Sequence, residues 1–194
     1  MNFLQGIGFT GNFTPLNIMR RMSILEKFKP ISTFVFDIDG VLTDGSIQVF
    51  DTGEQVRRMS IKDGYSLQLA IKKGYRVLVI SGGSSEGVRK RLQQLGVRDV
   101  FLGVENKKEK LMQYAQEHGL AEKEILFMGD DIPDHAAMTY AGLACAPADA
   151  VAEIRHIAGY ISAFGGGQGC VRDVIEKVLK LNGRWELDVS LASK

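Results

Sequence analysis

Side chains able to carry out acid–base and nucleophilic chemistry follow several short apolar runs of this sequence. Aspartates come after two of the runs, a hydroxyl after a third run, and an ammonium shortly after a fourth. In chain order they are Asp37, Asp39, Ser81, Lys107, Asp130, Asp131 and Asp134. A carboxylate can act as a nucleophile, a general acid/base or a metal ligand. A hydroxyl and an ammonium can bind the oxygens of an anion.

These residues are expected to meet at one edge of a sheet. In open α/β sheets, ligands bind beyond the carboxyl ends of the strands, and each of these residues stands just after such an end. Several acids packed together repel one another and need a cation. Because all the ligand atoms are oxygens, a hard ion is favoured, and Mg²⁺ is the usual choice where phosphate is also bound.

The elements that must position these residues are visible as an alternation of apolar runs and helical stretches. Continuous apolar runs are typical of parallel strands that are covered on both faces. The predicted strands are 33–36, 76–80, 100–102, 125–128 and 143–146. The predicted helices are 64–73, 85–95, 107–118, one that starts near Asp131, and about 171–181. This order predicts an α/β fold, a Rossmann-like open parallel sheet with helices on both faces.

One segment interrupts the alternation. Residues 45–60 carry Ile47, Val49 and Phe50, then Asp51-Thr52-Gly53, then Val56 and Met59. This pattern predicts a β-hairpin with a glycine-containing turn, directly after the first strand.

Composition narrows the class of protein. The chain has 194 residues with a net charge of +1, which argues against nucleic acid as a partner, and no apolar run is long enough to predict a membrane span. Cys145 and Cys170 are far apart and form no CxxC pair, so we expect a cytoplasmic protein without disulfides. Residues 1–21 show no sustained period and are predicted to be a disordered leader. A single domain is expected over 22–185, with a flexible tail over 186–194.

Two motifs resemble those of a known family. Phe36-Asp37-Ile38-Asp39-Gly40-Val41-Leu42-Thr43-Asp44-Gly45 looks like the first motif of the haloacid dehalogenase-type phosphatases, and Gly129-Asp130-Asp131-Ile132-Pro133-Asp134 resembles their fourth. Ser81 and Lys107 fall at matching places between them. The resemblance covers about residues 33–181 and is specific as a set, whereas two aspartates alone would be weak.

The resemblance implies a role for each residue. Asp37 is the expected nucleophile and forms an aspartyl-phosphate. Asp39 is the expected general acid/base. Mg²⁺ is expected on Asp37, the backbone carbonyl of Asp39, and Asp130. Ser81, Gly82 and Lys107 are expected to bind the phosphoryl oxygens, while Asp131 and Asp134 support the metal site and Asp134 orients Lys107.

Structural alternatives stay open for several of these residues. Asp131 can equally be a helix cap, and Ser81 can simply belong to a turn. Lys108 or Lys110 can take the place of Lys107, because all three stand near the start of the same helix.

The spacing of the motifs suggests how substrate is enclosed. The hairpin, one helix and one strand use up the chain between Asp39 and Ser81, so no separate cap domain fits. The sequence is most similar to the capless subgroup of the family, which forms homotetramers. Within it, the chain resembles phosphatases of 3-deoxy-D-manno-octulosonate 8-phosphate, a precursor in lipopolysaccharide sugar biosynthesis.

That second resemblance rests on two further segments. They are Ile61-Lys62-Asp63-Gly64-Tyr65 and Gly166-Gly167-Gln168-Gly169-Cys170-Val171-Arg172-Asp173. It implies that the glycine-rich segment helps to close the site of an adjacent subunit, and that Lys62, Asp63 and Arg172 contact the phosphorylated sugar acid. A salt bridge on its own helix is an equal alternative for Arg172.

Two departures from the family pattern leave the substrate open. Many members read Thr-Gly-Arg where this chain has Ser81-Gly82-Gly83, and glutamate is common where this chain has Asp173. Phosphates of nine-carbon sugar acids of the sialic acid type are therefore a second candidate substrate. A non-catalytic binding module and a phospho-accepting receiver are weaker alternatives, since both Asp37 and Asp39 are present.

Overall fold

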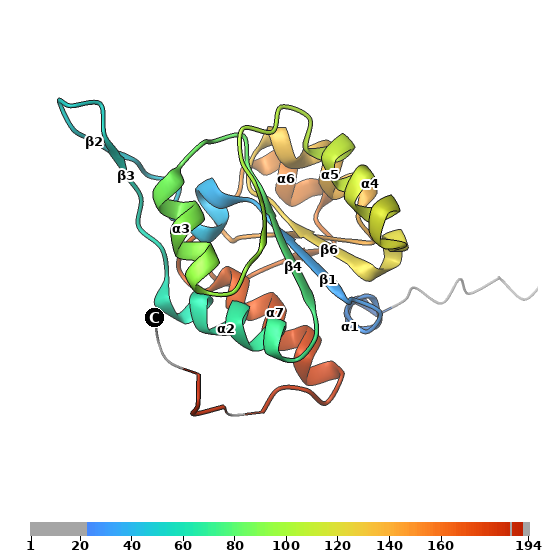
Figure 1. Cartoon of the computed structure of the whole chain (residues 1–194). Coiled ribbons are helices and arrows are strands. Elements are labelled where there is room, and N and C mark those ends of the chain that lie inside the picture. Colours follow the sequence, from blue (N-terminus) through green and yellow to red (C-terminus); the bar gives the residue numbers. More distant parts are fainter. Residues whose placement is uncertain (1–22, 187, 192–194) are drawn as a thin grey trace, which may run out of the picture.

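Six strands lie side by side in one parallel sheet of the computed structural model, which describes residues 23–186 and 188–191 (Figure 1). The strand order across the sheet is β5-β4-β1-β6-β7-β8. Their bounds are β1 Thr33–Phe36, β4 Arg76–Ile80, β5 Asp99–Phe101, β6 Ile125–Met128, β7 Leu143–Ala146 and β8 Tyr160–Ile161. The predicted α/β fold with an open parallel sheet is confirmed.

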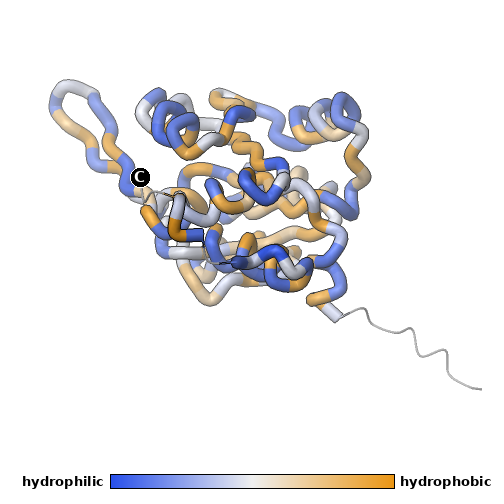
Figure 2. Tube along the Cα trace, turned by 60° about the horizontal axis from the view of Figure 1, so that its bottom comes forward, coloured by the Kyte–Doolittle hydropathy of each residue, from blue (hydrophilic) through white to orange (hydrophobic). Residues whose placement is uncertain are grey.

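Helices cover both faces of this sheet. On one face pack α1 (Ile24–Phe28), α2 (Ile61–Lys72), α3 (Glu86–Gln94) and α7 (Cys170–Leu181). On the other pack α4 (Lys107–His118), α5 (His135–Tyr140) and α6 (Ala152–Ile157). Apolar residues are concentrated on the strands inside the molecule, whereas hydrophilic and hydrophobic residues alternate along the surrounding helices (Figure 2). The buried apolar residues of these helices pack against the strands.

The strands are mostly apolar because successive residues face opposite layers. In β1, Phe34 and Phe36 belong to the core under α2 and α7, whereas Val35 belongs to the core under α4 and α5. All four residues of β1 are buried. Both faces of the strand therefore need mostly apolar side chains, and charged residues first occur where the strand ends.

A β-hairpin projects from the body of the molecule (Figure 1). Its strands are β2 (Gln48–Val49) and β3 (Gln55–Val56), which pair antiparallel. Thr43 and Met59 form an isolated bridge at its base, so the chain returns from the hairpin next to the loop that follows β1. The hairpin predicted over 45–60 is present.

The observed elements differ from the predicted ones mainly at their ends. The helix expected over 64–73 begins at Ile61, because the Ser60 hydroxyl accepts the N–H of Asp63 and caps it. The helix expected from Asp131 is divided into a short 3₁₀ turn, η3 (Ile132–Asp134), and α5. Three short elements, α1, α6 and β8, were not predicted.

Another 3₁₀ turn, η2 (Glu122–Glu124), leads into β6. Within the described part of the chain, no helix has the length and apolar character needed to cross a membrane. The predicted leader lies outside the described residues, and the domain boundaries stay predictions.

Candidate active site

The loop after β1 brings the first two aspartates to the carboxyl edge of the sheet. The Asp37 N–H donates to the carbonyl of Met128, which ties the end of β1 to the end of β6. The chain then turns tightly through η1 (Ile38–Leu42), with Gly40 at a φ of +86°. A β-carbon at Gly40 would lie 2.0 Å from Oδ2 of Asp130. Glycine is therefore required where this loop approaches the acids after β6.

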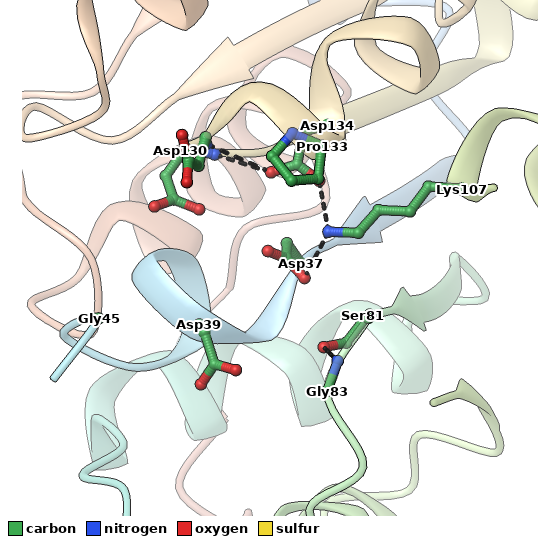
Figure 3. Close-up of a pocket in the computed structure, with 11 residues that line it drawn as sticks. Asp37, Asp39, Gly45, Ser81, Gly83, Lys107, Asp130, Pro133 and Asp134 are labelled. Atoms are coloured by element: carbon green, nitrogen blue, oxygen red, sulfur yellow. Dashed lines mark hydrogen bonds and ion pairs between the residues drawn. The ribbon is translucent and has the colours of Figure 1, made fainter. Parts of the chain in front are cut away.

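A pocket of about 300 Å³ opens at this edge (Figure 3). Its walls come from the ends of β1, β4 and β6 and from the start of α4. They consist of Asp37, Asp39, Gly45, Ser81, Gly82, Gly83, Lys107, Asp130, Asp131, Pro133 and Asp134. The structure thus brings together all the residues predicted from the strand ends, and adds Gly45, Gly83 and Pro133.

Lys107 lies at the floor of the pocket between two carboxylates. Its Nζ is 2.9 Å from Oδ1 of Asp37 and 2.7 Å from Oδ1 of Asp134, and only 6% of its side chain is exposed. Burial alone would lower the pKa of Lys107, but the charges of Asp37 and Asp134 outweigh it and raise the pKa. Lys107 is therefore a fixed positive charge. The alternative residue Lys108 is exposed on the same helix.

Asp134 connects Lys107 to the loop after β6. Its Oδ2 accepts the N–H of Asp130 at 3.1 Å and lies 3.5 Å from the N–H of Asp131. Its side chain is 1% exposed. Through these contacts Asp134 fixes both the Lys107 ammonium and the backbone that carries Asp130.

Three carboxylates form a group suited to a divalent cation. Asp37, Asp130 and Asp134 each offer an oxygen, and these atoms lie within 4.8 Å of one another. Burial and the nearby charge of Asp134 raise the pKa of Asp37 to about 7. Burial and the charges of Asp37 and Asp134 likewise raise the pKa of Asp130 to about 7. Among the described residues, the buried Oδ1 of Asp130 has no hydrogen-bond partner. A hard cation would supply the missing positive charge and a partner for this oxygen.

Ser81 and Asp131 also make the structural contacts that were kept as alternatives. Ser81 is buried, and its Oγ accepts the N–H of Gly83 at 3.1 Å, as in a turn. Asp131 is exposed and caps η3 by accepting the N–H of Ile132 at 2.7 Å. Both residues still line the pocket.

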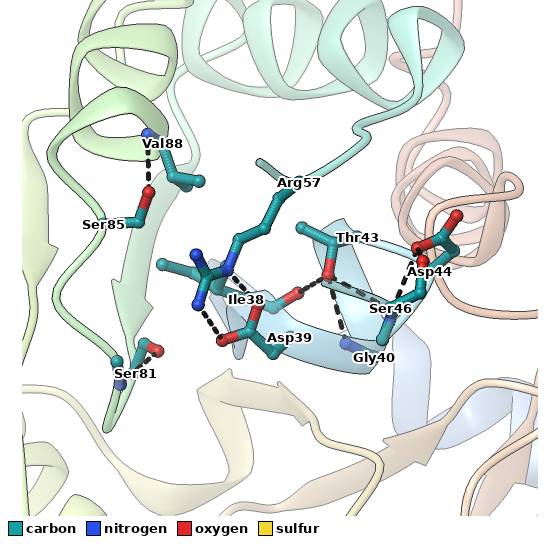
Figure 4. A network of polar contacts seen from close by, with 12 residues as sticks. Ile38, Asp39, Gly40, Thr43, Asp44, Ser46, Arg57, Ser81, Ser85 and Val88 are labelled. Atoms are coloured by element: carbon teal, nitrogen blue, oxygen red, sulfur yellow. Dashed lines mark hydrogen bonds and ion pairs between the residues drawn. The ribbon is translucent and has the colours of Figure 1, made fainter. Parts of the chain in front are cut away.

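Sequence reasoning missed Arg57, which binds Asp39. Arg57 Nε donates to Oδ1 of Asp39 at 2.7 Å (Figure 4). Arg57 follows β3, and the bridge between Thr43 and Met59 brings this part of the hairpin back to the loop after β1. The only sequence signal is an arginine pair, Arg57 and Arg58, at the predicted end of the hairpin.

Lys62, Asp63 and Arg172 lie outside this pocket. Asp63 is 1% exposed and accepts the backbone N–H groups of Gly169 and Arg172, at 3.2 and 2.7 Å. Arg172 pairs with Glu176 on its own helix at 3.4 Å, the alternative kept open for it. Lys62 and Arg172 instead line a separate cavity of about 470 Å³ beside α7.

The glycine-rich segment before α7 packs on its own chain. The Gly167 N–H donates to the Val41 carbonyl at 2.9 Å, and the Cys170 thiol lies 3.3 Å from the same oxygen. Gly165 and Gly166 are buried. Phe164 and Gln168, at this segment, are exposed and can contact a neighbouring molecule. The buried glycine backbone cannot.

Comparison with known proteins places these features in context. No protein-family profile matches the chain. The 3-deoxy-D-manno-octulosonate 8-phosphate phosphatase KdsC of Escherichia coli K12 is 30% identical to it over 161 residues, which are 83% of this chain and 86% of that protein.

Solved structures agree with this sequence match. A 3-deoxy-D-manno-octulosonate 8-phosphate phosphatase from Moraxella catarrhalis, in complex with a magnesium ion, a phosphate ion and a KDO molecule, superposes with a TM-score of 0.80 at 31% identity. The match covers 83% of this chain and 93% of that one. The cobalt-bound phosphatase from Haemophilus influenzae superposes with a TM-score of 0.77 at 28% identity, covering 81% of this chain and 92% of that one.

Proposed function

We propose that this chain is a magnesium-dependent phosphomonoesterase acting on 3-deoxy-D-manno-octulosonate 8-phosphate. The chain belongs to the family of phosphatases of that sugar acid phosphate, within the haloacid dehalogenase superfamily. One observation carries the proposal. Asp37, Asp130 and Asp134 form one acidic group, with Lys107 between two of them, at the carboxyl edge of the sheet. Ser81 faces the same pocket.

The first half of the reaction uses the two aspartates after β1. An oxygen of Asp37 attacks phosphorus, and the bond from phosphorus to the sugar oxygen breaks. Asp39 gives its proton to that oxygen, so the sugar leaves as an alcohol. Lys107 and Ser81 bind the phosphoryl oxygens and hold the group in line with Asp37.

The second half regenerates the enzyme. Asp39 takes a proton from water, whose oxygen attacks phosphorus and displaces Asp37. Phosphate leaves, and Asp39 is protonated for the next cycle. Asp37, Asp130 and Asp134 would hold a magnesium ion, which would neutralise charge on the phosphoryl group and so lower the repulsion between it and Asp37.

A substrate panel tests this proposal. Phosphate release is measured, with and without Mg²⁺, from the eight-carbon and nine-carbon sugar acid phosphates and from neutral sugar phosphates. We expect the highest kcat/KM for the eight-carbon substrate, and a fall of more than about 10³-fold in Asp37→Asn. A higher kcat/KM for the nine-carbon substrate would replace the proposed substrate, and activity retained in Asp37→Asn would overturn the mechanism.

The assembly that encloses the site is also a proposal. Val49 on the projecting hairpin is 65% exposed, and Ile47, Phe50 and Val56 are each more than 40% exposed. Apolar residues gathered on a protrusion mark a contact surface. The hairpins are proposed to join four copies of the chain, with the exposed face around Phe164, Gln168 and Arg172 completing a neighbour's site.

The proposed location is the cytoplasm. Cys145 and Cys170 are both buried and unpaired as free thiols. Free thiols of this kind are typical of proteins in a reducing compartment.

A further inference from the structure

Arg57 makes a forked contact with the proposed general acid/base. Its Nε lies 2.7 Å from Oδ1 of Asp39, and its Nη2 lies 3.5 Å from Oδ2. The Arg57 side chain is 9% exposed and that of Asp39 is 36% exposed. The guanidinium is thus the more buried partner, and it fixes the direction of the carboxylate.

The pair stands between two cavities. Asp39 lines the phosphate pocket, whereas Arg57 lines an adjoining cavity of about 360 Å³ between the hairpin and the start of α3. Met59 and Val88 are also part of the wall of that cavity. Figure 4 shows Arg57 reaching from the hairpin side toward Asp39. A leaving group that extends from the phosphate pocket past Asp39 therefore meets the Arg57 guanidinium.

Gly83 leaves room for this arrangement. A β-carbon at Gly83 would lie 3.2 Å from Oδ2 of Asp39, 3.5 Å from Oγ of Ser81 and 4.0 Å from Nη2 of Arg57. A larger side chain would therefore enter the space between the turn at Ser81 and the ion pair. With glycine there, the guanidinium lies near both the phosphate-binding hydroxyl and the proton donor.

Arg57 has donors left for an anionic ligand. Lys107 is already paired with Asp37 and Asp134. In Arg57, Nε and Nη2 face Asp39, and a guanidinium has five N–H donors, so the Nη1 hydrogens remain for a second acceptor. A carboxylate matches this planar donor set well.

We propose that Arg57 is a specificity-determining residue, which binds the carboxylate of the leaving sugar acid and holds Asp39 beside the leaving oxygen. This inference rests on the proposed function and adds a residue to it. If Arg57 binds this carboxylate, the kcat/KM of the enzyme depends on a substrate group that is remote from the phosphorus atom.

The test compares two substrates that differ in the leaving group. The sugar acid phosphate carries a carboxylate, whereas p-nitrophenyl phosphate has none, and its leaving group needs no proton. In Arg57→Gln we expect kcat/KM for the sugar acid phosphate to fall by about 30-fold or more, largely through KM. The value for p-nitrophenyl phosphate should fall much less, because only the positioning of Asp39 as general base, which both substrates need, is weakened. Arg57→Lys should restore part of the loss, because it keeps the charge but not the fork.

Arg58→Gln is the matched control. Arg58 is the next residue, its side chain is 83% exposed, and it pairs with Asp44 outside the pocket, so both activities should stay near the wild-type values. Equal losses for both substrates in Arg57→Gln, or no loss for the sugar acid phosphate, would overturn the proposal. Failure of the proposed function is seen separately, as a wild-type enzyme that hydrolyses p-nitrophenyl phosphate but not the sugar acid phosphate.

Discussion

At the scale of single residues, Lys107 contributes the positive charge of the site, and its neighbours in sequence do not. It is buried between Asp37 and Asp134, whereas Lys108 on the next position of α4 is exposed. In Lys107→Met we expect kcat/KM to fall by at least about 100-fold, because a preorganised charge on the phosphoryl oxygens is lost. The free energy of unfolding at pH 8 should also fall, since two buried carboxylates lose their partner.

Lys108→Met is the control for this prediction. The substitution has the same size and charge change, on the same turn of the same helix, so kcat/KM and stability should both stay near wild type. Phosphate release and thermal melting measure the two effects. An active Lys107→Met enzyme together with an inactive Lys108→Met enzyme would reverse the assignment.

The same acids make the action of magnesium depend on pH. The pKa of Asp37 and of Asp130 is about 7 in the folded protein, against 3.8 for an ordinary aspartate. Between these values, the folded protein keeps protons that the unfolded chain releases. The metal-free protein is therefore most stable at the acidic end of this window and loses stability as pH rises toward 7.

Magnesium must displace these protons, so it should stabilise the protein more at high pH. At about pH 8, Mg²⁺ at 100 times its Kd should add about 2.7 kcal/mol, which is roughly 5–10 °C in Tm for a chain of this size. At about pH 5.5 the same concentration should raise Tm much less. Differential scanning calorimetry checks this, and Asp130→Asn should remove most of the effect. A larger shift at pH 5.5 would contradict the assignment of these acids to the metal.

At the scale of elements, Asp63 links α2 to the start of α7. Its two oxygens accept the N–H groups of Gly169 and Arg172, more than 100 residues away in the sequence. Asp63→Ala leaves these buried donors without a partner, so the free energy of unfolding should fall by about 1–3 kcal/mol. Asp63→Asn keeps one acceptor oxygen and should lose less. Urea denaturation measures both losses.

Enzyme assays separate this structural role from the substrate contact that the sequence suggested. Folded Asp63→Asn protein should keep kcat/KM within about 3-fold of wild type, because Asp63 lies outside the phosphate pocket. A large loss of kcat/KM with unchanged stability would instead favour a substrate contact at this position.

The long apolar elements were predictable from sequence, but the short ones were not. Strands β1, β4, β6 and β7 have the predicted bounds because each is a largely apolar, buried run that ends before a polar residue, a glycine or a proline, namely Asp37, Ser81, Gly129 and Pro147. α6 has six residues and β8 has two, and such lengths show no period that can be told from a loop. Their formation depends on the sheet edge beside them.

Some residues of the candidate site were likewise predictable from sequence, and others were not. Residues at the strand ends were predictable, since the topology of a parallel sheet brings them to one edge. Arg57 was not, because its place beside Asp39 depends on how the hairpin returns to the body of the molecule. The packing of Asp63 beneath α7 likewise depends on tertiary contacts that no local pattern encodes.

At the scale of the whole molecule, the site lies at one edge of the sheet, and the residues that the structure describes form no separate domain above it. The hairpin projects from the body of the molecule (Figures 1 and 2). Several of its apolar side chains are exposed. An aspartyl-phosphate needs protection from unproductive reactions, and in this fold other copies of the chain are the proposed cover. Oligomerisation and activity should therefore be coupled.

The double substitution Val49→Lys with Phe50→Asp tests that coupling, because it places two charges in the proposed contact between hairpins. We expect the wild-type chain to have the mass of four chains by light scattering after size exclusion, and the variant a lower mass. kcat/KM for the sugar acid phosphate should fall together with the tetramer fraction, while the far-ultraviolet circular dichroism stays unchanged. Gln48→Lys, at an exposed polar position of the same strand, is the control and should remain tetrameric. A monomeric wild-type enzyme with full activity would show that the hairpin has another purpose.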